Sequence, residues 1–94
     1  MYYVYILRSL KSHIFYYGYT ENLKRRFAEH NGGKSTFTKP HIPWRLVWYS
    51  AFDDKRKAEE FELYLKSGSG KAFVYKRLVN VPLDKSEKKS VPKL

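Results

Sequence analysis

The chain has no cysteine among its 94 residues, so it can form neither a disulfide nor a thiolate metal site. No apolar run in it approaches the roughly 20 residues that are needed to span a bilayer. The residues from Met1 to Tyr5 also lack the basic region and the small-residue cleavage site of a signal peptide. These absences fit a reducing compartment, and we therefore expect a cytoplasmic protein without a membrane segment.

The signatures of several enzyme classes are missing as well. The sequence has no glycine-rich phosphate loop of the P-loop type and no paired-histidine metal motif. Its three histidines are scattered, and no pattern around them indicates a Ser-His-Asp triad. Any chemistry must therefore come from another combination of side chains.

Basic and aromatic residues are what the chain has in abundance. The net charge is +10, and there are nine tyrosines. Residues 1–52 contain eight basic and two acidic residues, whereas residues 53–66 contain four basic and five acidic ones. A basic, aromatic-rich surface suits nucleic acid, because it neutralises phosphates and stacks on bases. Composition alone also fits a protein that is basic only for solubility.

The length and the 43% apolar content predict one small folded domain. We expect an α+β fold over residues 1–79, followed by a mobile basic tail over residues 80–94. Alternating aromatic and β-branched residues predict three strands, the first two paired as an antiparallel hairpin and the third well buried: 2–7, 14–19 and 45–52.

Apolar spacing and capping residues predict three helices: 21–31, 54–66 and 70–79. Thr20 is the expected N-cap of the first helix, either Asp53 or Asp54 that of the second, and Ser69 that of the third. Each of these side chains carries an oxygen that can accept from an unpaired backbone N–H at a helix start.

The stretch from Tyr16 to His30 joins the second strand to the first helix. Arg26 and His30 are four residues apart, so they are neighbours on one helix face. A phenol, a guanidinium and an imidazole can thus meet at one corner. These groups suit phosphodiester chemistry as a proton acceptor, a bidentate phosphate clamp and a titratable base.

The loop over residues 32–44 contains no acidic residue and has two glycines and two prolines. Its lysines and hydroxyls can meet a phosphate chain, although a solvated connector fits the composition equally well. The residues that we expect to contact nucleic acid lie in this loop and beside it: Lys24, Arg25, Lys34, Thr38, Lys39 and Arg45.

Short motifs follow one another in a fixed order over residues 2–79: Tyr3-Val4-Tyr5, Tyr16-Tyr17-Gly18, Tyr19-Thr20-x-x-Leu23-x-x-Arg26-x-x-x-His30-Asn31, Gly32-Gly33-Lys34, Pro43-Trp44-x-Leu46-Val47 and Ala58-x-x-x-Glu62-x-x-Leu65-Lys66-Ser67-Gly68. Each motif is weak alone, but the ordered set is specific. In this order the chain resembles the GIY-YIG nuclease superfamily, specifically the small stand-alone domains that resemble the N-terminal domain of the excinuclease C subunit.

The resemblance implies a three-stranded antiparallel sheet flanked by helices. It also implies a single divalent cation, Mg²⁺ or Mn²⁺, held by Glu62, and a catalytic arginine at Arg26. By the resemblance, the family's two catalytic tyrosines correspond to Tyr5 and Tyr16. A histidine that is found in part of the family corresponds to His30. On composition alone, each of these residues would be an ordinary packing or surface residue.

Two departures from the family pattern leave the hydroxyl positions intact. Tyr3 replaces the glycine that opens the first motif, and Tyr17 replaces the isoleucine of the second. A family asparagine near the end of the domain has only Asn80 as a candidate counterpart.

The predicted function is a metal-dependent DNA endonuclease, structure-selective or weakly sequence-specific, acting in DNA repair or recombination. Because the domain is small, we expect its specificity to need a protein partner or self-association. The alternatives are a DNA-binding module that has lost turnover and a basic protein–protein adaptor.

Overall fold

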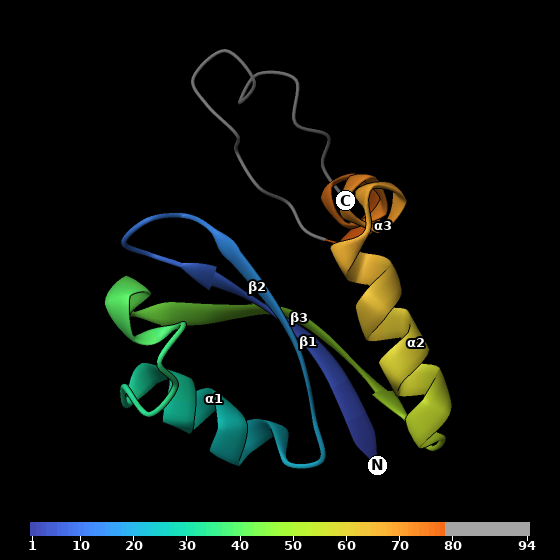
Figure 1. Cartoon of the computed structure of the whole chain (residues 1–94), viewed down its shortest axis with the longest axis horizontal. Helices are drawn as coiled ribbons and strands as arrows, with labels where there is room; N and C mark the ends of the chain where they lie inside the picture. The colour runs from blue at the N-terminus through green and yellow to red at the C-terminus, as the bar shows by residue number, and fades with distance from the viewer. Residues whose placement is uncertain (79–94) are drawn as a thin grey trace.

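The computed structural model describes residues 1–78 and places a three-stranded sheet at the centre of the protein (Figure 1). The strands are β1 (Tyr2–Ser9), β2 (Phe15–Thr20) and β3 (Trp44–Phe52). Their order is β2-β1-β3, and β1 pairs antiparallel with both neighbours. The predicted α+β fold with an antiparallel sheet is therefore confirmed.

Helices cover both faces of the sheet. Helix α1 (Leu23–Asn31) lies on one side, and α2 (Lys55–Lys66) with α3 (Gly68–Phe73) lies on the other (Figure 1). A short 3-10 turn, Lys39–His41, interrupts the loop before β3, and a π-helical turn, Val74–Leu78, follows α3. None of the helices within residues 1–78 is long and apolar enough to cross a membrane.

The central strand β1 divides its side chains between two clusters. Val4 and Ile6 are fully buried under α2, together with apolar residues of that helix and of the π-helical turn. Tyr5 and Leu7 are buried on the opposite face with Trp44, and residues of α1 pack against them. We call these the α2 face and the α1 face of the sheet. The period of two along β1 thus supplies both cores at once.

The third strand differs from the sequence prediction. It was expected to be well buried, but it is an edge strand in which only Trp44 is buried. Its pairing with β1 also shifts, because Ile6 pairs with Trp48 while Leu7 pairs with Leu46. Val47 is therefore an extra residue in β3, that is, a β-bulge.

The observed cap of α1 differs from the prediction by two residues, and that of α2 agrees with it. Asn22, not Thr20, caps α1, because its side chain accepts from the N–H of Arg25. Thr20 instead ends β2, where its hydroxyl accepts from the N–H of Asn22. Asp54 caps α2, which confirms one of the two predicted alternatives.

The third helix begins and ends earlier than the predicted span 70–79. Its N-cap is Ser67 rather than Ser69, because the Ser67 hydroxyl accepts from the N–H of Gly70. Val79, the candidate Asn80 and the expected tail lie outside the described residues, so the domain boundary stays a prediction.

Candidate active site

A chain of three buried side chains lies on the α1 face. The Tyr5 hydroxyl is 2.8 Å from His30 Nε2, and His30 Nδ1 is 2.8 Å from Thr38 Oγ1. Tyr5 is 1% exposed, and His30 and Thr38 are both fully buried. In the tautomer with its proton on Nδ1, His30 donates a hydrogen bond to Thr38, and its Nε2 accepts a hydrogen bond from the Tyr5 hydroxyl. This arrangement joins β1, the last turn of α1 and the loop before β3.

Gly18 makes room for the Tyr5 ring. The two residues are paired across β1 and β2, and a Cβ at position 18 would overlap the end of the Tyr5 ring, its hydroxyl included. Only glycine lets the ring lie against the neighbouring strand. The tyrosine that ends the Tyr3-Val4-Tyr5 motif therefore requires the glycine that ends the Tyr16-Tyr17-Gly18 motif. The middle residue, Tyr17, points to the α2 face and is buried in its apolar cluster.

Tyr16 also lies at this corner. Its ring meets the His30 ring edge-on at a centroid distance of 4.9 Å, and its centroid is 6.3 Å from that of Tyr5. Tyr16 is half-buried, unlike Tyr5. The structure therefore brings together both predicted tyrosines and the predicted histidine.

The surroundings keep both Tyr5 and His30 neutral. Burial raises the pKa of Tyr5 far above its ordinary value, Tyr16 adds to this, and the positive charge of Arg26 partly opposes it. Burial and, to a smaller extent, the positive charge of Arg26 lower the pKa of His30 to about 4. At neutral pH, Tyr5 therefore holds its proton and His30 has a free nitrogen to receive it.

Arg26 lies beside this chain but is already partnered. Its Nη1 is 3.0 Å from Glu29 Oε1, and this hydrogen bond holds the pKa of Arg26 above its ordinary value. Arg25 approaches the other oxygen of Glu29 at 3.7 Å. The Arg26 side chain is 34% exposed and that of Arg25 is 70% exposed. Arg26 is thus the arginine that faces the tyrosine–histidine corner, as predicted, while Arg25 projects into solvent.

Glu62 stands on α2, and its side chain is 20% exposed. The negative charge of Glu62 makes a small contribution to the raised pKa of Tyr5, so the carboxylate is within electrostatic reach of the hydroxyl. Lys66, one helical turn later, lies 3.0 Å from Glu62. Within residues 1–78, no group of three or more His, Asp or Glu side chains could hold a metal ion. A cation bound here would have Glu62 as its carboxylate ligand.

Most of the residues predicted to contact nucleic acid are exposed: Lys24, Arg25, Lys34, Lys39 and Arg45. Thr38 is the exception, because it is fully buried and its hydroxyl is bonded to His30. The Thr38 hydroxyl is therefore engaged within the protein, and the expected contact of Thr38 with nucleic acid stays a prediction. The loop buries this hydroxyl against the imidazole, while its lysines and other residues such as Phe37 face solvent.

Sequence reasoning missed two contacts of this site. The spacing of Glu29 from Arg25 and Arg26, four and three positions, was a usable signal for its ion pairs. The bond from Thr38 to His30 spans eight residues of irregular chain, and no periodicity predicts such a contact.

Comparison with known proteins shows the family to which the chain belongs. The family model described as the GIY-YIG catalytic domain matches residues 1–76, and the chain belongs to this family. It is 40% identical over 67 residues to the UPF0213 protein CPE1444 of Clostridium perfringens, which covers 70% of this chain and 71% of that protein.

Two further matches belong to the same group of proteins. The chain is 33% identical over 89 residues to the UPF0213 protein SpyM3_1077 of Streptococcus pyogenes, covering 94% and 92% of the two chains. A solution NMR structure of the UPF0213 protein BH0048 from Bacillus halodurans is 37% identical with a TM-score of 0.49, covering 79% of this chain and 82% of that one.

Proposed function

We propose that the protein is a divalent-metal-dependent DNA endonuclease that hydrolyses phosphodiester bonds. The observation that carries this proposal is the buried Tyr5–His30–Thr38 chain beside Arg26 in a member of the GIY-YIG family. A fully buried imidazole with both nitrogens bonded is held in one orientation, as a proton acceptor requires. The exposed basic residues around it supply a surface for the phosphate backbone.

The proposed proton path begins at Tyr5. Its phenolate is strongly disfavoured, so the hydroxyl accepts a proton from water only as it passes its own proton to His30 Nε2. The hydroxide formed attacks phosphorus, the phosphodiester bond breaks, and the leaving oxygen takes a proton from solvent. Thr38 holds the imidazole in place throughout, and the low pKa of His30 favours return of the proton through the Tyr5 hydroxyl. Tyr16 packs on the imidazole edge and shields it.

Arg26 is proposed to bind the phosphate that is cut. A guanidinium matches the phosphate oxygens in a bidentate manner and stabilises charge that grows in the transition state. Glu29 already bonds Nη1, which fixes the direction of the guanidinium and leaves its other N–H groups for the substrate.

The donor set fits the metal that the family implies. Mg²⁺ is commonly held by one or two carboxylates together with waters and phosphate oxygens, and Glu62 is a partly exposed carboxylate near Tyr5. When bound, the cation would polarise the phosphate and lower the pKa of a bound water. Lys66 is paired with one oxygen of Glu62, so its positive charge competes with the metal for this carboxylate.

One observation favours the alternative of a binding module without turnover. Arg26 and Glu62 both have oppositely charged partners within the chain, at 3.0 Å each. The test is incubation of the full chain with branched, nicked, flapped and linear DNA in Mg²⁺ or Mn²⁺. Cleavage that is lost in Glu62→Gln and in Tyr5→Phe supports the nuclease. Binding without cleavage across the panel supports a DNA-binding module without turnover. Absence of any DNA binding supports a protein–protein adaptor.

The biological setting of this activity is also a proposal. Action on DNA in repair or recombination suits a structure-selective endonuclease, and specificity in so small a domain is proposed to come from a protein partner or self-association. Sedimentation of the protein with and without its best DNA substrate tests the second of these, because self-association would raise the protein's mass on the DNA.

A further inference from the structure

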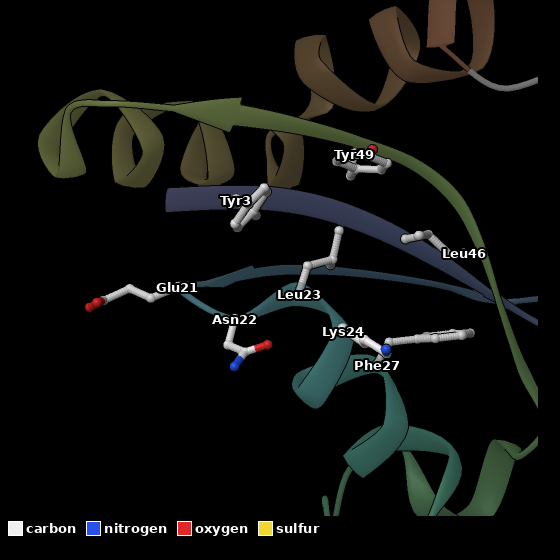
Figure 2. Close-up of a pocket in the computed structure, with 8 residues that line it drawn as sticks. All are labelled: Tyr3, Glu21, Asn22, Leu23, Lys24, Phe27, Leu46 and Tyr49. Atoms are coloured by element: carbon white, nitrogen blue, oxygen red, sulfur yellow. The ribbon is translucent and has the colours of Figure 1, made fainter. Parts of the chain in front are cut away.

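A pocket of about 530 Å³ opens on the α1 face, between the start of α1 and strands β1 and β3 (Figure 2). Volumes of this order are typical of small-molecule sites. Its walls combine two tyrosines, three apolar side chains and one lysine: Tyr3, Tyr49, Leu23, Phe27, Leu46 and Lys24. Nothing in the proposed proton path uses this pocket.

The pocket lies directly beside the candidate active site. Tyr49 pairs with Tyr5 across β1 and β3, and Tyr3 is two residues from Tyr5 on the same strand. Side chains that are paired in this way lie about 5 Å apart at their Cβ atoms. The β-bulge at Val47 is what turns both Leu46 and Tyr49 to this face, although they are three residues apart.

The two tyrosines are available to a ligand. Their ring centroids are 6.3 Å apart at an interplanar angle of 58°, and Tyr49 is 53% exposed. Figure 2 shows the Leu23 side chain reaching from the start of α1 toward them. A flat aromatic group entering the pocket would meet π-faces and aliphatic carbon rather than charge.

The lysine at the rim can meet an anionic group. Lys24 and Glu21 both line the pocket, and the Glu21 carboxylate points away from the tyrosine rings (Figure 2). A nucleotide matches both features, because it carries a flat aromatic base and an anionic phosphate. An acidic peptide would satisfy the lysine but would leave the aromatic walls without a partner.

We propose that this pocket holds one unpaired nucleobase of the strand being cleaved, stacked on Tyr49 and Tyr3. This inference rests on the proposed function, since it places the adjoining phosphate at Arg26 and Tyr5. The substrate class is therefore DNA with an unpaired nucleotide next to the bond that is cut. Stacking on aromatic side chains is tolerant of sequence, which agrees with selection by DNA structure.

The test compares two otherwise identical duplexes. One carries an unpaired 2-aminopurine nucleotide, and the other has an abasic site at the same position, so that the phosphate chain is kept and the base is removed. Binding of the full chain is measured by anisotropy of an end label, and stacking by quenching of 2-aminopurine fluorescence. The variants are Tyr49→Ala, Tyr49→Phe, which keeps the ring, and Tyr75→Ala as a control tyrosine, 46% exposed on the α2 face.

Tyr49→Ala is expected to weaken binding of the base-bearing duplex by roughly tenfold to a hundredfold and to leave the abasic duplex unaffected. Tyr49→Phe and Tyr75→Ala should both bind like the parent protein, with the quenching retained. Equal effects of Tyr49→Ala on the two duplexes would overturn the assignment of the pocket to a base. Base-dependent binding without cleavage in Mg²⁺ would support the pocket while contradicting the nuclease, and failure to bind either duplex would contradict both.

Discussion

The two faces of the sheet bury tyrosine in different company. On the α2 face, Tyr17 lies among apolar side chains such as Val4 and Leu65, and burial raises its pKa to about 12. On the α1 face, Tyr5 is buried against His30, whose second nitrogen is bonded to Thr38. Burial weakens the acidity of both phenols, but only Tyr5 has a base at hydrogen-bond distance. The α2 face thus buries its tyrosine by apolar packing, whereas the α1 face buries a polar chain whose desolvation costs free energy unless its groups are hydrogen-bonded.

The largest expected effect is a stability change on the α2 face. Leu65→Ala removes a fully buried side chain from the apolar cluster, so unfolding should become easier by about 2–5 kcal/mol. Leu63→Ala on the same helix is the control, because Leu63 is 66% exposed and should change stability by less than about 0.5 kcal/mol. Urea denaturation measures both. Equal losses of stability in the two variants would show that Leu65 contributes no more to the apolar cluster of the α2 face than an exposed leucine does.

The next effect concerns catalysis on the α1 face. Arg26→Ala should lower single-turnover cleavage by roughly 10²–10³, since it removes a preorganised donor to developing charge. Arg25→Ala should mainly weaken DNA binding, because that side chain is 70% exposed and projects away from the corner. If both variants cleave bound DNA at the same rate, Arg26 is not the phosphate clamp.

Removing the Thr38 hydroxyl should have a smaller effect. Thr38→Val keeps the shape but leaves the buried His30 Nδ1 without a partner, which should cost about 1–3 kcal/mol of stability and slow cleavage. Thr38→Ser should restore most of both. The comparison of thermal unfolding and cleavage across the three proteins is the measurement. Unchanged cleavage in the stable Val variant would show that the imidazole needs no orientation.

A pH titration sharpens the contrast further. Unfolded His30 gains a proton below about 6.5, whereas folded His30 stays neutral down to about 4. The unfolded chain therefore binds more protons in this window, and stability should fall by roughly 1–3 kcal/mol as pH drops through it. His30→Gln should show a shallower fall between pH 6.5 and 5, as followed by denaturant unfolding at each pH. An identical fall in both proteins would mean that His30 does not titrate as described.

The smallest effect is electrostatic. Lys34→Gln and Lys39→Gln, in the loop that holds Thr38, should each reduce the slope of log K against log salt by about 0.9 for duplex DNA. Lys57→Gln on α2 is the matched control and should leave the slope unchanged. The slopes come from binding titrations at several salt concentrations. A change for Lys57 but not for the loop lysines would move the DNA to the other face.

Much of this arrangement was predictable from local sequence. The alternation in residues 2–7 predicted a strand with two faces, and the spacing of Arg26 from His30 predicted that they share a helix face. The motif order then predicted the family, which the match over residues 1–76 confirms. The roles of Tyr5, Tyr16, Arg26, His30 and Glu62 stay predictions until activity is measured.

The remaining features depend on contacts that no local pattern encodes. Thr38 looks like any loop hydroxyl, and only the folded chain turns it inward to His30. The α1 cap was misplaced because Thr20 and Asn22 both suit a helix start, and tertiary pairing keeps Thr20 in β2. The pocket beside Tyr5 was missed because strict alternation places Leu46 and Tyr49 on opposite faces, whereas the bulge places them together.

The bulge at Val47 also sets which side chains of β3 face the pocket. Before the bulge the even-numbered residues Trp44 and Leu46 lie on the α1 face, and after it the odd-numbered Tyr49 does, so the strand changes phase once. Deleting one residue between Leu46 and Tyr49 would leave these two residues two positions apart, and simple alternation would then keep both on the pocket side. Such a deletion would remove the extra residue and, with it, the local bend of β3. A related sequence with a single-residue gap at this point can therefore keep the same pocket walls on a straighter strand.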